Sequence, residues 1–223
     1  MQMTYRKEAS KRPATRGFRN NGREAFSAPS TAWNVTTDAR GFAGMFDKLA
    51  PIDRYGPAAR EAAHIPALER AAVTLCHLGR GGLIWHGLAL ALGVRSPRLR
   101  RLERTGAVSA TIAAAFGLST MLARVTARPR PCRDGVASAV PCPDGGSFPS
   151  DQAAAAFAAA GSLPSLAPEL RMPLSVAAAA FSAARVAVGV HHPTDVIAGA
   201  LLGAATARAG VTVVTRLSSL PSR

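Results

Sequence analysis

Three polar side chains lie close together in an otherwise apolar stretch near the carboxyl end of the sequence. In "RVAVGVHHPTDVIAGALLG", Arg185 precedes His191 by six residues and Asp195 follows His191 by four. The first spacing is close to two helical turns, so Arg185 and His191 can project to one side. Asp195 is placed to accept an Nδ1–H bond from His191, which leaves Nε2 free to attack as a nucleophile. Pro193 interrupts the helix here, so the pattern indicates a reactive site at a helix break.

Two further clusters contain groups that suit an anion. The segment "ARPRP" places Arg128 and Arg130 at the end of an apolar helix, and a guanidinium presents a planar fork of donors to phosphate oxygens. The segment "FPSDQ" begins the next apolar helix, with Ser150 as its N-cap and backbone N–H groups available to an anion. Taken singly, the arginines fit a membrane-flanking pair and the serine a simple cap. Together with the first cluster, they predict a phosphate site.

The elements that must position these groups are helices. Hydrophobic residues make up 48% of the 223 residues and aromatic residues only 5%, so alanine, leucine and valine dominate. This composition favours helices packed through small residues. The apolar segments are 71–94, 105–127, 153–166, 172–190 and 194–215, and the longer ones approach the roughly 20 residues that span a bilayer. We therefore expect an all-α membrane bundle of about five helices.

The remaining segments suggest a simple domain organisation. Residues 1–46 are polar, basic and aperiodic, which predicts a disordered tail, and 47–70 are typical of an amphipathic surface segment. The helical membrane domain is predicted over 71–215, with a short tail at 216–223. Cys132 and Cys142 lie in the Pro- and Gly-rich loop 128–152, and their spacing allows a disulfide in an oxidising compartment.

The formal net charge of +14 suggests a nucleic acid or an anionic membrane surface as partner. The charge is mostly arginine in short clusters between apolar runs, without an aromatic-flanked basic stripe, which argues against nucleic acid. The arginine-rich loop 95–104 is expected in the cytoplasm. Counting spans from it places the polar clusters on the extracytoplasmic face, although the basic tail would then lie outside as well. A soluble all-helical protein is the alternative.

The order of these motifs resembles the type 2 phosphatidic acid phosphatase (PAP2) superfamily, which includes membrane lipid phosphatases and vanadium-dependent haloperoxidases. The family pattern is K-x6-R-P, then P-S-G-H, then S-R-x5-H-x3-D, and the similarity covers roughly residues 70–215. The resemblance implies that His191 is a nucleophile that forms a phospho-histidine and is oriented by Asp195. It also implies that Arg130 and Arg185 bind the phosphoryl oxygens with help from Ser150. It implies no metal and no cofactor.

The sequence departs from the family pattern at three positions. The lysine of the first motif falls on Ala123, with Arg124 and Arg128 nearby, and the serine of the third motif is Ala184. The histidine of the second motif, the family's general acid, falls on Gln152. An amide cannot donate a proton in this pH range. Gln152 is therefore counted here with the phosphate-binding residues.

We expect a phosphatase that hydrolyses a phosphorylated lipid, namely phosphatidate, phosphatidylglycerol phosphate or a polyprenyl phosphate or diphosphate. Its expected location is the cell membrane, as a multi-pass protein with the site on the extracytoplasmic face. Two alternatives stay open: a PAP2-like protein that binds phospholipid without turnover, and a soluble helical acid phosphatase. The sequence does not decide whether the chain forms a homo-oligomer.

Overall fold

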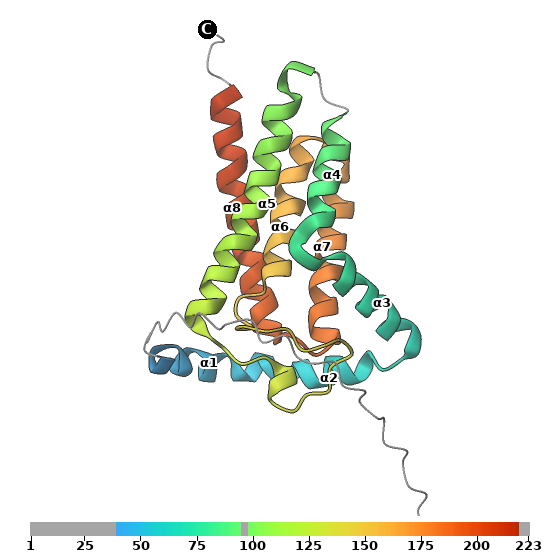
Figure 1. The fold of residues 1–223 in the computed structure, drawn as a ribbon, viewed down its shortest axis with the longest axis vertical. Coiled ribbons are helices and arrows are strands. Elements are labelled where there is room, and N and C mark those ends of the chain that lie inside the picture. The colour runs from blue at the N-terminus through green and yellow to red at the C-terminus, as the bar shows by residue number, and fades with distance from the viewer. Residues whose placement is uncertain (1–38, 95–97, 219–223) are drawn as a thin grey trace, which may run out of the picture. The chain divides into compact units, whose positions relative to one another are not determined.

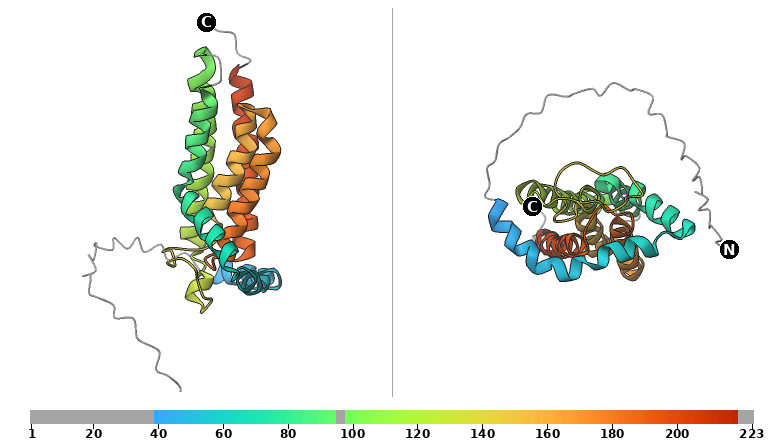
Figure 2. Two further views of the ribbon diagram at one scale, coloured as in Figure 1. Left: turned by 90° about the vertical axis from the view of Figure 1, so that its right-hand side faces the viewer. Right: turned by 90° about the horizontal axis from the view of Figure 1, so that it is seen from below.

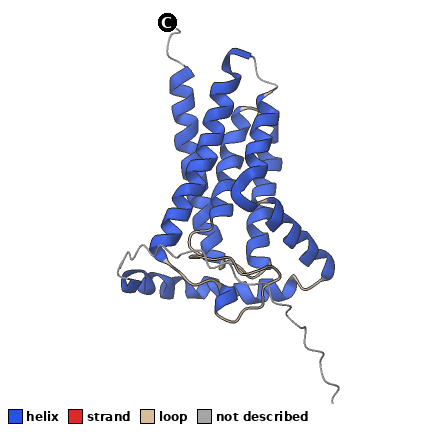
Figure 3. Cartoon of the chain, viewed as in Figure 1, coloured by secondary structure: helices blue, strands red, loops and turns tan. Residues whose placement is uncertain are grey.

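The computed structural model describes residues 39–94 and 98–218, and every regular element within them is helical (Figure 3). The all-α prediction is therefore confirmed for this part of the chain. Its α-helices are α1 (Ala39–Asp53), α2 (Tyr55–Ala62), α3 (Pro66–Leu78), α4 (Leu83–Gly93), α5 (Arg98–Thr126), α6 (Asp151–Ser162), α7 (Arg171–Ala187) and α8 (Pro193–Ser218).

Helices α4 to α8 lie side by side as a bundle, and α6 packs against α5, α7 and α8 (Figures 1 and 2). The alanines of α6 at 153–156 and 158–160 are buried. Small side chains let the backbones come close together, and a Cβ added to Gly203 of α8 would overlap the Ala154 carbonyl. This tight contact holds α8 against α6, and the first turns of both helices carry predicted site residues.

The segment 71–94, expected as one apolar helix, is two helices in the structure. α3 ends at Leu78 and α4 begins at Leu83. Between them Gly81 and Gly82 have φ angles of 67° and 70°, a left-handed conformation that favours glycine. The break turns α3 away from the bundle, so that its amino end lies beside α2 (Figure 1). The prediction of a single helix here was wrong because the glycine pair was read as part of an apolar run.

Helices α1 and α2 lie across one end of the bundle, next to the long loop between α5 and α6 (Figure 1). α1 contacts α8, and α2 contacts α7. α1 begins at Ala39, inside the segment 1–46 that was expected to be a tail. Residues 1–38 of that tail, and 219–223 of the predicted carboxyl-terminal tail, lie outside the described residues.

One stretch of the described chain, Glu103–Arg133, is long and apolar enough to cross a membrane by length and composition. Met121, Leu122 and Val125 within it are exposed. Several membrane spans were expected, and one segment of the described residues meets this criterion. α6, with 12 residues, is shorter than the roughly 20 residues that a bilayer core requires.

Candidate active site

The predicted site residues gather at the end of the bundle that α1 and α2 cover. They come from the loop after α5, the first turn of α6, the last turn of α7 and the turn into α8. His191 lies between α7 and α8, outside both helices, and its side chain is almost fully buried. Gly189, two residues earlier, has a φ of 80°, and a Cβ there would press on the Ala137 carbonyl. The turn therefore depends on glycine at this position.

The His191 ring is held by both nitrogens. Nδ1 lies 2.9 Å from the Ser147 carbonyl oxygen, and Nε2 lies 3.0 Å from Arg130 Nη1. A carbonyl only accepts hydrogen bonds, so Nδ1 carries the proton and Nε2 presents its lone pair. Burial lowers the pKa of His191, and the positive charges of Arg185 and Arg130 lower it further. The imidazole is therefore neutral near pH 7, and its Nε2 lone pair accepts a hydrogen bond from Arg130.

Asp195 is fully buried beside this ring, but its carboxylate lies closer to other groups than to His191. Its Oδ2 is 3.5 Å from His191 Nδ1, whereas the Ser147 carbonyl is 2.9 Å away. Asp195 accepts hydrogen bonds from Arg128 Nη1 at 2.6 Å and from the His192 backbone N–H at 2.8 Å. The nearer acceptor for the histidine is thus a backbone carbonyl, and Asp195 supplies a negative charge behind it.

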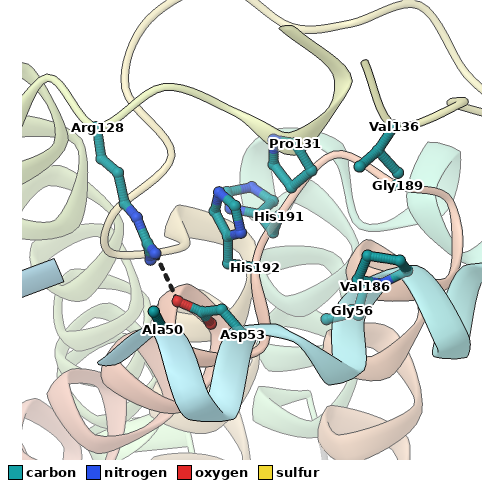
Figure 4. A pocket seen from close by; sticks show the side chains of 11 residues that line it. Ala50, Asp53, Gly56, Arg128, Pro131, Val136, Val186, Gly189, His191 and His192 are labelled. Atoms are coloured by element: carbon teal, nitrogen blue, oxygen red, sulfur yellow. Dashed lines mark hydrogen bonds and ion pairs between the residues drawn. The ribbon is translucent and has the colours of Figure 1, made fainter. Parts of the chain in front are cut away.

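Arg128 is engaged by two carboxylates. Its Nη2 contacts Asp53 at 2.5 Å, as Figure 4 shows, and its Nη1 contacts Asp195 at 2.6 Å. Its guanidinium carbon lies 4.5 Å from the centre of the Phe46 ring. With both terminal nitrogens paired, this side chain is placed to hold Asp195 rather than to meet a ligand first. The sequence grouped it with the phosphate-binding residues.

Asp53, at the end of α1, is a site residue that the sequence analysis missed. Its carboxylate also accepts hydrogen bonds from the Thr194 backbone N–H at 3.0 Å and from the Thr194 hydroxyl at 2.8 Å. It therefore joins α1 to the first turn of α8. A lone aspartate 141 positions before Thr194 carries no local signal of this contact.

Arg130 and Arg185 differ from Arg128 in having no carboxylate within ion-pair distance among the described residues. Arg130 donates to the backbone carbonyls of Gly145, Gly146 and Val190. Arg185 is 5% exposed, and its Nε has no hydrogen-bond partner. Both guanidinium groups line one cavity of about 370 Å³. Two buried cations that form no ion pair among the described residues, at one cavity, suit a bound anion.

Ser150 and Gln152 stand at the start of α6, as the sequence predicted. Ser150 is buried and its hydroxyl accepts from the Ala153 N–H at 3.5 Å, so it caps the helix. Its own N–H donates to the Asp195 carbonyl at 2.9 Å, which ties α6 to α8. Gln152 lines the cavity that contains Arg130 and Arg185. The second-motif position thus faces the anion site.

The position of the missing family lysine, Ala123, has a cation beside it. Arg124 lines a neighbouring cavity of about 290 Å³ together with Arg130 and His191. It is an exposed residue at the end of α5. A positive charge is therefore available near His191 from the adjacent position.

Cys132 and Cys142 form the disulfide that their spacing allows, within the loop between α5 and α6. The same loop supplies the Ser147 carbonyl to His191. Within the described residues, no three side chains of histidine, cysteine, aspartate or glutamate gather as a metal site would need.

The chain is similar to known proteins in sequence. Residues 104–219 match the PAP2 superfamily. Decaprenylphosphoryl-5-phosphoribose phosphatase of Mycobacterium tuberculosis (strain H37Rv) is 34% identical over 139 residues, which cover 62% of this chain and 76% of that protein. The protein of the same name in Mycolicibacterium smegmatis is 33% identical over 138 residues, covering 60% and 72%.

Solved structures share the fold. The transmembrane PAP2-type phosphatidylglycerolphosphate phosphatase of Bacillus subtilis superposes with a TM-score of 0.66 at 21% identity, over 82% of this chain and 93% of that one. Aquifex aeolicus LpxE superposes with a TM-score of 0.61 at 25% identity, over 71% and 93%. On its motifs, fold and sequence relatives, the chain belongs to the PAP2 superfamily.

Proposed function

We propose that this chain is a membrane-bound phosphatase that removes a phosphoryl group from a phosphorylated lipid through a phospho-histidine intermediate on His191. The observation that carries the proposal is the pairing of a neutral, oriented nucleophile with an unpaired cationic site. His191 Nε2 lies 3.0 Å from Arg130, and Arg130 and Arg185 line one cavity without carboxylate partners among the described residues.

The reaction takes place in two steps. His191 Nε2 attacks the phosphorus, and the bond from phosphorus to the lipid oxygen breaks. Arg130 and Arg185 stabilise the charge on the phosphoryl oxygens. Water then attacks the phosphorus, the bond to Nε2 breaks, and inorganic phosphate leaves. We assign Arg128 and Asp195 to positioning, because each is held in a buried ion pair.

The proposed substrate class is a polyprenyl-phosphate-linked phosphomonoester. Support comes from the two mycobacterial relatives, whose names specify a 5-phosphate on a decaprenylphosphoryl ribose. A site at the end of a bundle suits a long apolar chain in the bilayer with its head group at the surface. Phosphatidate, phosphatidylglycerol phosphate and polyprenyl mono- and diphosphates are the competing substrates.

We place the active site on the extracytoplasmic face. The arginine-rich segment 95–104 precedes or begins α5, whereas the site lies at the other end of that helix (Figure 1). Short arginine-rich segments stay in the cytoplasm by the positive-inside rule. The Cys132–Cys142 disulfide, at the same end as the site, suits an oxidising compartment.

A second candidate, a protein that binds phospholipid without turnover, is favoured by Gln152 alone. The test is a phosphate-release panel in detergent micelles over phosphatidate, polyprenyl monophosphate, polyprenyl diphosphate and a polyprenylphosphoryl pentose 5-phosphate. We expect release by the wild type, an acid-labile phosphoenzyme, and loss of both in His191→Ala. Binding of these lipids without release would support the second candidate, and release unchanged in His191→Ala would refute the proposed mechanism.

A further inference from the structure

The leaving-group side of the site lacks the acid that the proposed reaction needs. When the bond from phosphorus to a sugar or glycerol oxygen breaks, the departing alkoxide is a strong base and requires a proton. Gln152 occupies the position from which the family's histidine would act, and its amide cannot supply one. The inference below rests on the proposed function and concerns where this proton comes from.

His77 lines the same cavity as Gln152, Arg130 and Arg185. It lies in the last turn of α3 and is exposed, so it stands at the rim rather than in the packed interior. Within the described residues its side chain forms no hydrogen bond and no ion pair. Its ring nitrogens are therefore available to a ligand in the cavity.

The end of α3 is fixed against the site by two contacts. A Cβ added to Gly79 would lie 3.2 Å from Gln152 Oε1, so the turn after His77 packs directly on the start of α6. The neighbouring Cys76 is buried and contacts the Arg185 guanidinium. The helix break at the glycine pair after α3 thus brings the His77 imidazole to the cavity that Gln152 lines. Gln152 itself cannot donate a proton there.

The other groups at this cavity are less suited to donate. Asp144 is paired with Arg133 at 3.0 Å, and Asp151 accepts the Gln152 backbone N–H at 2.7 Å. His192 lines a cavity of about 240 Å³ that His191 and Asp53 also line but that Arg130 and Arg185 do not (Figure 4). Among the described residues that line the cavity of Arg130 and Arg185, His77 is the only imidazole.

We propose that His77 is the general acid of this enzyme, in place of the histidine that the family carries at position 152. As His191 Nε2 bonds to phosphorus and the phosphorus–oxygen bond breaks, the His77 imidazolium gives its proton to the departing oxygen, which leaves as an alcohol. Neutral His77 then accepts a proton from the attacking water. The phosphorus–Nε2 bond breaks, and inorganic phosphate leaves with His77 recharged for the next turnover.

The test compares two leaving groups in His77→Gln, because p-nitrophenolate leaves without protonation and an alkoxide does not. For the alkyl phosphomonoester that the wild type hydrolyses fastest, we expect kcat/KM to fall by about 10²–10⁴-fold. For p-nitrophenyl phosphate we expect little change. His86→Gln is the matched control, since His86 on α4 lines none of the cavities at the site. It should leave both rates unchanged.

A rescue variant separates catalysis from folding. Gln152→His placed in the His77→Gln background should restore hydrolysis of the alkyl substrate, since it returns an acid to the family position. An equal loss on both substrates in His77→Gln would overturn the proposal. So would an unchanged rate of alkyl phosphate hydrolysis in His77→Gln, where turnover by the wild type depends on His191. A wild type with no release from any substrate and no phosphoenzyme would instead refute the proposed function itself.

Discussion

The two sides of the His191 ring are built differently. Behind the ring, Asp53, Arg128 and Asp195 form a buried chain of ion pairs, with separations of 2.5 and 2.6 Å. Beyond Arg130, which contacts Nε2, the side chains of His77, Arg80 and Asp144 are exposed around the cavity that Arg130 and Arg185 line. The nucleophile is held rigidly, whereas the groups that meet the leaving group have few ties to the protein.

This difference separates the two tasks of a phosphatase. Holding a histidine in one tautomer serves every substrate equally, and Asp195, behind the ring, matches the family motif. Protonating and accommodating the leaving group depends on which alcohol departs. The departures at Ala123 and Gln152 both fall on the side that faces the ligand. We infer that variation at this site changes substrate choice more readily than it changes the nucleophile.

Among the residues proposed to bind the phosphoryl oxygens, Arg185 should show a large effect on every substrate. Arg185→Ala removes a buried donor aimed into the cavity, and losing one such preorganised group costs roughly 10²–10³-fold in kcat. Arg208→Ala, an exposed arginine of α8 outside this cavity, is the control and should change little. The measurement is steady-state phosphate release with the best substrate of the panel. Equal effects of the two substitutions would show that Arg185 acts through bulk charge alone.

The buried side should be nearly as sensitive at a residue that touches no substrate. Asp53→Asn weakens the ion pair with Arg128, and Arg128 then holds Asp195 less firmly. A shift of about 1 Å in the nucleophile can cost about 10²-fold in kcat. The substitution should also lower the thermal unfolding midpoint, because it leaves a buried charge less well compensated. Asp47→Asn, an exposed acid on the same helix, should alter neither quantity.

A change in kcat/KM for p-nitrophenyl phosphate and the alkyl substrate by the same factor would place Asp53 on the nucleophile side of the comparison. His77→Gln, in contrast, should separate the two substrates. If Asp53→Asn affected only the alkyl substrate, the division of the site into two sides would be incorrect.

The pH profile should report the burial of His191. Its pKa is lowered by burial and then by Arg185 and Arg130, and the neutral ring is the reactive form. In the pH profile of kcat/KM, the apparent pKa of the acid limb should therefore lie below the value of about 6.5 typical of an exposed histidine. Arg185→Gln removes one positive neighbour, so the limb should move upward in that variant. A limb above 6.5 in the wild type would contradict a buried neutral nucleophile.

The sign of the linked stability follows from the same shift. Below about pH 6.5 the unfolded chain binds a proton at this histidine that the folded chain does not, so protonation favours unfolding. Stability contributed by His191 should be present above that pH and fall as the pH drops. His191→Gln should show a weaker loss of unfolding midpoint between pH 7 and pH 5 than the wild type.

Much of the nucleophile side was predictable from the sequence because its spacing is local. Arg185, His191 and Asp195 lie within eleven positions, and one turn brings them together. The all-α class followed from apolar segments rich in alanine. In contrast, the acceptor for His191 Nδ1 is the Ser147 backbone carbonyl, which no residue type encodes. The spacing predicted Asp195 in that role, but the acceptor is determined by the conformation of the loop that contains Ser147.

Long-range partners could not be predicted for a different reason. Asp53 meets Arg128 only because α1 crosses the end of the bundle, and a contact between residues 75 positions apart leaves no periodic trace. His77 reaches the anion cavity only because Gly81 and Gly82 break the apolar run that contains it. Both residues were visible as isolated polar positions. Their meaning depended on the arrangement of helices in space.

The smallest expected effect concerns the Cys132–Cys142 disulfide, which lies in the loop that serves both sides. It closes a loop of ten positions, and a bridge of that size contributes about 2–3 kcal/mol to stability in the chain-entropy view. The loop is also anchored by its own contacts, since Ser147 donates to the Arg128 carbonyl and Ser119 donates to the Pro149 carbonyl. Those contacts lie between the disulfide and α6. Replacing both cysteines by serine should therefore lower the unfolding midpoint while leaving kcat within about threefold of the wild type, under 1 kcal/mol of barrier. A loss of activity as large as that of Asp53→Asn would show that the disulfide, rather than the buried ion pairs, holds the Ser147 carbonyl against the nucleophile.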